Sequence, residues 1–244
     1  MQKSQKDLIY SSPQANVPDF QFDNRVAEVF PDMIQRSIPG YNTILDGIGF
    51  LSTKFVKPNT QVYDFGCSLG AASLAVRRYN ESENVNIVAI DNSEAMLERC
   101  ALHLSAFKSN TTFTTRCEDI LDSEINNASL VIMNFTLQFI APDLRKRVIK
   151  KIYDGLLPGG ALILSEKLKH ETEEGNELLI DIHHEFKRRN GYSELEISQK
   201  RTAIENVMII DSFQEHETRL KETGFKDIAM WFKCYNFASM VAIK

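Results

Sequence analysis

The sequence predicts one α/β domain whose mostly parallel sheet ends in an antiparallel hairpin. Between residues 61 and 166, short runs rich in β-branched residues alternate with stretches of helical periodicity, which is the pattern of βαβ units. Residues 228–233 and 237–243 form two further strand-like runs with three residues between them, as in a hairpin. The 244 residues, of which 43% are hydrophobic and 25% charged, are typical of a globular chain with its own core.

The elements follow in order along the chain. Helices are expected at 23–34 and 41–55, where Pro39-Gly40 separates them. Five strands are expected at 61–65, 85–90, 111–117, 130–134 and 161–166, with helices at 71–79, 93–105 and 142–156 between them. Beyond these, helices are expected at 173–189, 193–205 and 211–223, and Gly224 is placed to end the last of them. We therefore divide the domain 1–244 into an N-terminal helical cover (1–60), the core (61–166), a helical insert with the last core helix (167–223) and the terminal hairpin (224–244).

Composition limits the partners and the compartment. The net charge of −5 argues against broad, sequence-independent nucleic-acid binding, so we expect no direct nucleic-acid contact. The four cysteines form no C-x-x-C pair and no zinc pattern, and we expect buried, reduced thiols. Residues 1–16 lack the apolar segment of a secretory signal, and no apolar run is long enough to cross a membrane. These observations favour a cytoplasmic protein with no membrane partner.

A glycine-containing turn follows the first strand of the core. The run VYDFGCSLGA at 62–71 is a short strand that ends in Gly66, Cys67 and Ser68 and leads directly into a helix. Ligands of open α/β sheets bind at the carboxyl ends of strands, so this turn is a candidate cradle. The dinucleotide pattern G-x-G-x-x-G needs glycine at 68 and 71, where Ser68 and Ala71 stand, so a pyrophosphate-bound dinucleotide fits less well. Simple helix–strand packing is the alternative explanation of the turn.

Polar residues end the next strands as well. Asp91-Asn92 ends the second strand, 25 residues after Gly66, where a carboxylate accepts hydrogen bonds from ribose hydroxyls. Asp91 is equally suited to supporting the start of the helix at 93–105, and the two roles are compatible. At the end of the third strand, Asp119 supplies a carboxylate for an adenine amino group. Asn134 ends the fourth strand.

These residues resemble the class I S-adenosylmethionine-dependent methyltransferases. The resemblance rests on the glycine turn, Asp91, Asp119 and the link LLPGG at 156–160, and it implies a Rossmann-like fold for the core and hairpin. Longer runs resemble one narrower family, the carboxy-S-adenosylmethionine synthases, over nearly the whole chain. They are RVAEVFPDM at 25–33, SIPGY at 37–41, NFTLQF at 134–139 and GYSELEISQKR at 191–201.

The narrower resemblance implies a reaction in which S-adenosylmethionine and prephenate become carboxy-S-adenosylmethionine and phenylpyruvate. S-adenosylmethionine is then a substrate, no metal is expected, and a separate enzyme uses the product to carboxymethylate the wobble uridine of tRNA. The resemblance implies a homodimer, and it leaves open whether Arg201 serves its own subunit or its neighbour's. It assigns these residues to the adenosylmethionine site: Tyr41, Gly66, Cys67, Ser68, Asp91, Asn92, Asp119, Ile120 and Asn134, with Arg201 for the added carboxylate and for catalysis.

Two other functions remain open on sequence alone, a conventional small-molecule methyltransferase and a non-catalytic adenosylmethionine-binding module. Spacing alone favours a solvated Lys-Arg pair for Lys200-Arg201, and only the resemblance assigns Arg201 a role. The basic runs 145–147 and 187–189 are expected to be solvated helix faces, with a tRNA or anionic-substrate patch as the alternative. His183-His184 lacks a third nearby metal ligand, and Trp231 with Phe232 is expected in the core.

Overall fold

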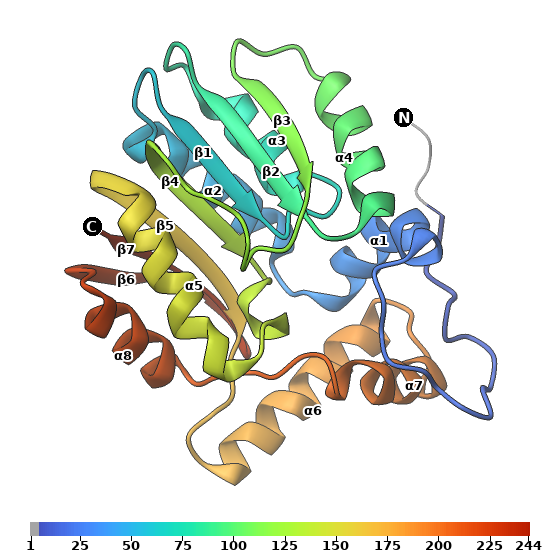
Figure 1. The fold of residues 1–244 in the computed structure, drawn as a ribbon. Helices are drawn as coiled ribbons and strands as arrows, with labels where there is room; N and C mark the ends of the chain where they lie inside the picture. Colours follow the sequence, from blue (N-terminus) through green and yellow to red (C-terminus); the bar gives the residue numbers. More distant parts are fainter. Residues whose placement is uncertain (1–4) are drawn as a thin grey trace.

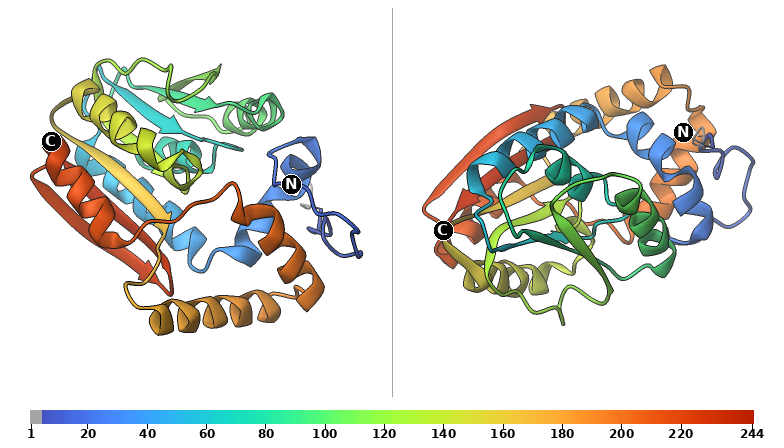
Figure 2. Two further views of the ribbon diagram at one scale, coloured as in Figure 1. Left: turned by 60° about the horizontal axis from the view of Figure 1, so that its bottom comes forward. Right: turned by 90° about the horizontal axis from the view of Figure 1, so that it is seen from above.

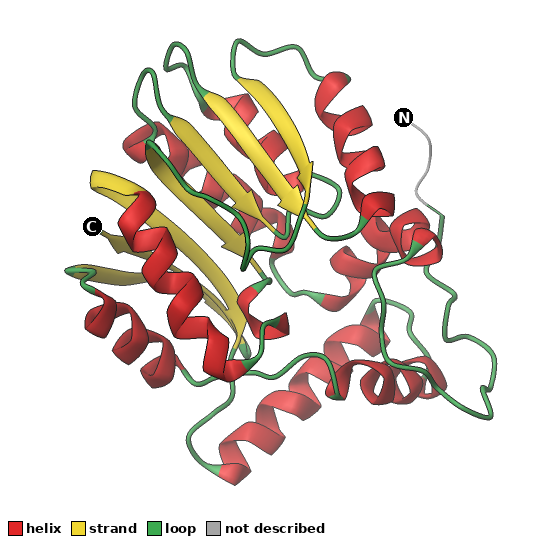
Figure 3. Cartoon of the chain, viewed as in Figure 1, coloured by secondary structure: helices red, strands yellow, loops and turns green. Residues whose placement is uncertain are grey.

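The computed structural model describes residues 5–244 and contains a seven-stranded sheet in the order β3-β2-β1-β4-β5-β7-β6 (Figures 1 and 3). β7 pairs antiparallel with both of its neighbours, and the pairs from β3 to β5 are parallel. The strands are β1 (Gln61–Phe65), β2 (Asn86–Asp91), β3 (Thr112–Cys117), β4 (Ala128–Asn134), β5 (Leu156–Lys167), β6 (Asp227–Cys234) and β7 (Phe237–Ile243). Residues 1–4, the start of the polar segment 1–16 and of the cover 1–60, lie outside the described residues.

Each α-helix lies close to the range that the sequence predicts, and the short 3-10 helix η1 was not predicted. They are α1 (Asn24–Ser37), α2 (Tyr41–Phe55), α3 (Ala71–Tyr79), α4 (Glu94–Ser105), the short η1 (Leu137–Phe139), α5 (Pro142–Gly155), α6 (Glu173–Arg189), α7 (Glu194–Glu205) and α8 (Phe213–Thr223). Local chemistry sets several ends. Ser193 and Ser212 begin α7 and α8 with reciprocal capping boxes, and Gly224, at φ +120°, ends α8 as predicted.

Helices cover both faces of the sheet (Figure 2). Alternate residues of a strand point to opposite faces, so each strand contributes to two cores. Val62 and Ile132 pack with α2 and α3 on one face, whereas Tyr63 and Val131 pack with α5 and α8 on the other. Burial on both faces explains why these central strands read as nearly continuous apolar runs.

Three helices, α1, α6 and α7, lie beyond the carboxyl ends of the parallel strands (Figure 1). The extended N-terminal segment is bound to them by polar contacts. The side-chain amide of Gln199, on α7, donates to the carbonyls of Tyr10 and Ser12 at 2.9 Å each, and the buried carboxylate of Asp7 accepts the Tyr192 hydroxyl. The chain thereby builds a lid over the strand ends.

β5 begins earlier than predicted, at Leu156 instead of residue 161, and the helix before it ends at Gly155. The reason is long-range pairing, because Leu156 pairs with Ala128 and the register then shifts so that Ala161 pairs with Leu130. Pro158, Gly159 and Gly160 lie inside this strand, and because such residues normally indicate a turn, the local sequence does not predict a strand there.

Two predicted solvated faces contain buried cations. Arg145 is fully buried and forms a 2.7 Å ion pair with Asp211, and Lys187 is only 9% exposed. The prediction for these two residues is therefore wrong, although their neighbours Lys146 and Arg189 are exposed. The cause in each case is a tertiary contact, which helical periodicity does not report.

The thiol prediction is confirmed in part. All four cysteines are free, and Cys67 and Cys100 are buried, but Cys117 is exposed and Cys234 is half-buried. Trp231 and Phe232 are half-buried and pack on the core cluster beneath α2. Among residues 5–244, no helix combines the length and the apolar character needed to span a membrane.

Candidate active site

One cavity of about 750 Å³ opens at the carboxyl ends of the parallel strands, beneath α1, α6 and α7. The structure places nine of the ten predicted site residues in its wall: Tyr41, Gly66, Cys67, Ser68, Asp91, Asn92, Asp119, Ile120 and Asn134. Arg201 is not in that wall. The topology explains the gathering, because strands far apart in sequence end at the same edge of the sheet.

The glycine turn is held in a conformation that its residues make possible. Gly66 has φ +67°, and a Cβ there would come within 2.5 Å of the Thr136 side chain. Ser68 also has a positive φ, of 48°, which a non-glycine residue rarely adopts. Its backbone N–H donates to Oδ2 of Asp91 at 2.9 Å. The turn is therefore fixed to the tip of the neighbouring strand.

Asp91 joins the two loops at the centre of the cavity wall. Besides Ser68, its carboxylate accepts the backbone N–H of Ser93 at 2.9 Å on Oδ1, and Ser93 caps α4. Burial raises the pKa of Asp91, and these hydrogen bonds oppose the rise by stabilising the carboxylate. A carboxylate has about four acceptor sites, so that of Asp91 can accept further donors besides the backbone N–H groups of the loops.

Three more polar groups share this half of the cavity. Asp64 is buried, accepts the N–H and the hydroxyl of Ser73 on Oδ2, and has a pKa raised to about 6 by burial. Asp119 accepts the Leu121 N–H at 2.7 Å. Oδ1 of Asn134 is buried with no hydrogen-bond partner within residues 5–244. A buried acceptor of this kind is normally satisfied, so it marks a position for a ligand donor.

Asp64 is a cavity residue that the sequence reasoning missed. The sequence contained a signal for this role. Asp64 is an acidic residue near the end of an apolar strand, two residues before Gly66, and a buried carboxylate needs a polar partner or a ligand.

Lysines line the opposite half of the cavity. Lys167 ends β5, Lys187 lies on α6 and Lys200 lies on α7. Burial lowers the pKa of Lys187 to about 7 and the pKa of Lys167 and of Lys200 to about 8. The sequence assigned no site role to Lys167 or Lys200, and it gave an anionic-substrate patch at 187–189 only as the alternative. The expectation that Lys200 is solvated is wrong, because Lys200 is only 7% exposed. The cavity thus has an acidic half at the tips of β1 to β4 and a cationic half at the end of β5.

His183 lies in the cavity wall next to the lysines. Its Nε2 is 2.8 Å from the carbonyl oxygen of Ser37, which only accepts, so Nε2 carries the proton. Burial and the neighbouring lysines lower the pKa of His183 to about 2, and the ring is neutral. Its ring also packs edge-on against Phe237. No group of three side chains suited to a metal occurs within residues 5–244.

Arg201 occupies an exposed position on α7. Its side chain is 53% exposed and is paired with Glu205 one helical turn away. The charge of Arg201 nevertheless lowers the pKa of the cavity residue Lys167, so the guanidinium lies near the cationic half. Its predicted contact with a ligand carboxylate stays a prediction.

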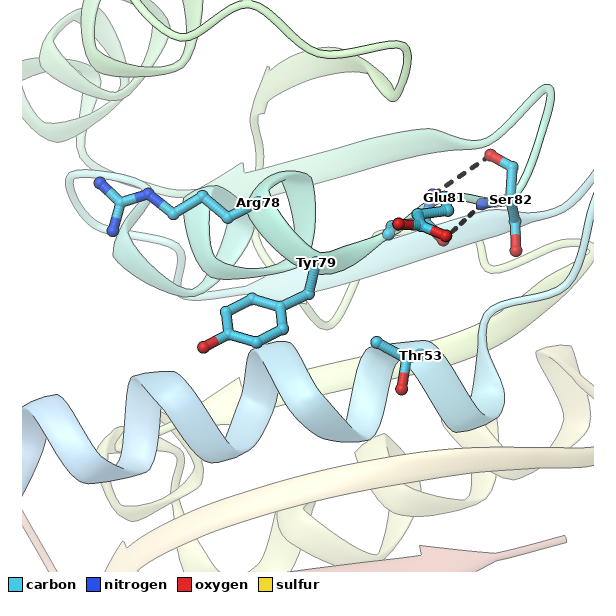
Figure 4. Close-up of a pocket in the computed structure, with 6 residues that line it drawn as sticks. Thr53, Arg78, Tyr79, Glu81 and Ser82 are labelled. Carbon is cyan, nitrogen blue, oxygen red and sulfur yellow. Dashed lines mark hydrogen bonds between the residues drawn. The ribbon is translucent and has the colours of Figure 1, made fainter.

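A second depression lies at the end of α3 (Figure 4). Its wall is made by Thr53, Arg78, Tyr79, Asn80, Glu81 and Ser82, and Asn80 and Ser82 hydrogen-bond each other across the loop. The Tyr79 ring packs directly over Gly49 of α2. This end of α3 is the one remote from Gly70 and the strand tips, so the depression is separate from the cavity described above.

Comparison with known proteins agrees with this geometry. Residues 63–162 match the family model for a methyltransferase domain. Among solved structures, a putative O-methyltransferase from Nostoc punctiforme superposes with a TM-score of 0.64 at 16% identity, over 91% of this chain and 59% of that one. Magnesium protoporphyrin IX methyltransferase from Synechocystis, solved with bound SAH, gives a TM-score of 0.59 at 17% identity over 97% and 91% of the two chains. The chain has the Rossmann-like fold of the class I S-adenosylmethionine-dependent methyltransferases.

Close relatives narrow the class. The carboxy-S-adenosyl-L-methionine synthase of Pseudoalteromonas atlantica is 61% identical over 242 residues, and that of Vibrio parahaemolyticus is 58% identical, each covering 99% of both chains. The synthase of Vibrio cholerae is 58% identical over 98% of this chain and 97% of that protein. The chain belongs to the carboxy-S-adenosyl-L-methionine synthase family and is an enzyme that uses S-adenosylmethionine to make the carboxylated product.

Proposed function

We propose that the carboxyl donor is prephenate, so that S-adenosylmethionine and prephenate become carboxy-S-adenosylmethionine and phenylpyruvate. The observation that supports this most directly is the division of one cavity into an acidic half at the strand tips and a cationic half under β5. A sulfonium substrate and a dicarboxylate substrate carry opposite charges, and each half complements one of them. We further propose that a separate enzyme uses the product to carboxymethylate the wobble uridine of tRNA.

The acidic half supplies what S-adenosylmethionine needs. Asp91 would accept the ribose hydroxyls through its remaining lone pairs, and Asp119 the adenine amino group. The unpartnered Oδ1 of Asn134 and the carboxylate of Asp64 would accept from the ammonium group of the methionine part. A buried acceptor without a partner is satisfied when this substrate is bound, which is the fit that the proposal requires.

The chemistry inverts the usual role of the methyl group. A methyl group on a sulfonium is an electrophile, and its protons are far too weakly acidic for an ordinary side-chain base. Prephenate loses carbon dioxide and hydroxide as its ring becomes aromatic. The hydroxide takes a methyl proton and becomes water, and the resulting sulfur ylide forms a C–C bond to the carbon dioxide. Charge and atoms balance without an oxidant, reductant or metal.

For such a reaction the enzyme has to hold the two substrates close together and exclude water. The lid of α1, α6 and α7 covers the strand tips, and apolar side chains such as Phe22, Phe139 and Leu144 line the cavity beside the polar groups. An enclosed site retains carbon dioxide beside the ylide and limits quenching by water. His183 is neutral, so it adds no positive charge that would hold the hydroxide away from the methyl proton.

Arg201 is proposed to bind the carboxylate that the reaction adds. Its fork suits two parallel hydrogen bonds to a carboxylate. In this chain Arg201 is exposed and paired with Glu205, so the role requires either a new rotamer or a cavity contributed by a neighbouring subunit. We propose a homodimer, in which Arg201 reaches the carboxylate either in its own subunit or in the neighbouring one.

Replacing Arg201 with alanine is expected to lower the rate of carboxylation at least about tenfold while changing the Kd for S-adenosylmethionine less than about threefold. The reason is that its target carboxylate is absent from the substrate and present in the product. Steady-state rates and calorimetric titration of the same preparation measure the two effects. Lys226→Ala, an exposed substitution after α8, serves as the control. Equal losses of rate and of affinity would instead indicate a structural role for Arg201.

The proposed reaction is tested by incubating the protein with S-adenosylmethionine and prephenate and measuring the product masses. A prephenate-dependent gain of one carbon dioxide on S-adenosylmethionine, with release of phenylpyruvate, is the expected result. Formation of S-adenosylhomocysteine and a methylated acceptor would indicate a conventional small-molecule methyltransferase. Binding of S-adenosylmethionine without turnover would indicate a non-catalytic module.

A further inference from the structure

The cationic half of the cavity contains more positive charge than the chain neutralises. Lys200 is 3.7 Å from the Asp7 carboxylate and donates to the Ser37 hydroxyl at 3.3 Å. Within residues 5–244, the ammonium groups of Lys167 and Lys187 form no hydrogen bond or ion pair with the protein. The Lys167 ammonium group lies 6.0 Å from the centre of the Phe237 ring, and the Glu205 carboxylate acts on it through space without forming an ion pair.

Burying these lysine side chains without an anionic partner costs folding free energy. Lys187 and Lys200 are 9% and 7% exposed, and buried lysines are nearly always paired. Lys167 and Lys200 also repel the ammonium group of Lys187, which adds to the effect of burial in lowering the pKa of Lys187. Hydrophobic residues of similar volume would fill these positions without the repulsion. A ligand anion is the partner that such a cluster lacks.

The elements that carry the lysines fix the shape of this subsite. One lysine comes from the end of β5, one from the lid helix α6 and one from α7, so three separate elements bring lysines to the wall of the cavity. Asp7 and Ser37 anchor the ammonium group of Lys200, whereas those of Lys167 and Lys187 are available. Two available cations beside one anchored cation match a ligand with two carboxylates better than a single anion.

We propose that Lys167 and Lys187 each bind one carboxylate of a dicarboxylate co-substrate. Lys200, held by Asp7 and Ser37, positions these two lysines and adds to the positive electrostatic potential of the subsite. This inference rests on the proposed function, because the dicarboxylate there is prephenate. It places the co-substrate between β5, α6 and α7, facing the sulfonium held at the tips of β1 and β2. Loss of one carboxylate as carbon dioxide then occurs next to the methyl group.

The test measures binding apart from chemistry. The full-length protein is saturated with S-adenosylhomocysteine, which has no methyl group to transfer, and prephenate is titrated by calorimetry. Lys167→Met and Lys187→Met are each expected to weaken prephenate binding by about tenfold to a hundredfold, as for loss of a hydrogen bond to a charged group. The affinity for S-adenosylhomocysteine should stay within about twofold of the wild type, because the acidic half is unchanged.

Lys146→Met is the matched control, since Lys146 is a helical lysine paired at the surface with Glu222. Methionine keeps the volume and removes a buried charge, so folding of the variants is expected to be preserved, and circular dichroism checks this. Lys187→Gln provides a second variant at that position that retains a polar group. It is expected to lose affinity as Lys187→Met does.

The outcomes separate this inference from the proposed function. Unchanged prephenate binding in the Lys167 and Lys187 variants, with prephenate turnover by the wild type, would overturn the subsite and leave the reaction standing. If the wild type neither binds nor converts prephenate, the proposed reaction fails, and malonate replaces prephenate as the probe. Malonate binding that is lost in both lysine variants would support the dicarboxylate subsite, and absence of malonate binding would overturn it.

Discussion

Replacing Asp91 with asparagine is expected to weaken S-adenosylmethionine binding by about a hundredfold or more. The carboxylate accepts backbone N–H groups of Ser68 and Ser93 on different oxygens, and the proposal adds the ribose hydroxyls. An amide offers one acceptor oxygen, and its NH2 group would face a backbone N–H. The glycine turn and the start of α4 would both lose alignment, besides the loss of the charged acceptor for ribose. Calorimetric titration with S-adenosylmethionine measures the change.

The matched control is Asp227→Asn, because Asp227 is an exposed residue at the start of β6 and far along the sheet from the cavity. Its affinity for S-adenosylmethionine should equal that of the wild type. An Asp91→Asn protein that folds normally and binds S-adenosylmethionine as tightly as the wild type would refute the assignment of the β2 tip to the adenosyl group.

The second large effect concerns stability. Replacing Arg145 with methionine is expected to lower the free energy of unfolding by about 3–5 kcal/mol, because two backbone carbonyl oxygens each lose a charged donor at about 1–3 kcal/mol and the ion pair is lost as well. Arg145 is fully buried, is paired with Asp211 at 2.7 Å and donates to the carbonyl oxygens of Ile140 and Ile209. The substitution leaves the carbonyl oxygens of Ile140 and Ile209 without this donor, whereas Asp211 keeps its 2.6 Å bond to Arg219. Urea denaturation followed by circular dichroism gives the difference.

Lys146→Met is the control here as well, since the neighbouring Lys146 forms only an exposed pair with Glu222. Its removal should cost less than about 1 kcal/mol. A loss of similar size in both variants would show that the Arg145–Asp211 pair has no special structural role.

Much of the fold was predictable because the signals are local. The β-branched runs, the helical periodicity and Gly224 each act over a short stretch of chain, and α2, α3 and α6 have their predicted bounds. The start of β5 was not predictable in this way. It depends on the pairing of Leu156 with Ala128, which is distant in the sequence, and Pro158 with its glycines conceals it.

The site divides in the same manner. Gly66, Asp91 and Asn134 each directly follow or end an apolar strand, so their gathering at one edge follows from the parallel topology. Lys187 lies in a basic run on an amphipathic helix, and a sequence pattern cannot distinguish a buried lysine from a solvated one. Its burial depends on how the lid packs over β5, which is a tertiary property.

In the proposed reaction, the carbon gained by the sulfonium methyl group comes from the dicarboxylate substrate. The most direct measurement uses prephenate labelled with carbon-13 in its ring carboxylate, together with unlabelled S-adenosylmethionine and unlabelled bicarbonate. Mass spectrometry is expected to find carboxy-S-adenosylmethionine carrying the label, with unlabelled phenylpyruvate in equal amount. Carboxy-S-adenosylmethionine without the label, or S-adenosylhomocysteine as the only adenosyl product, would contradict the account.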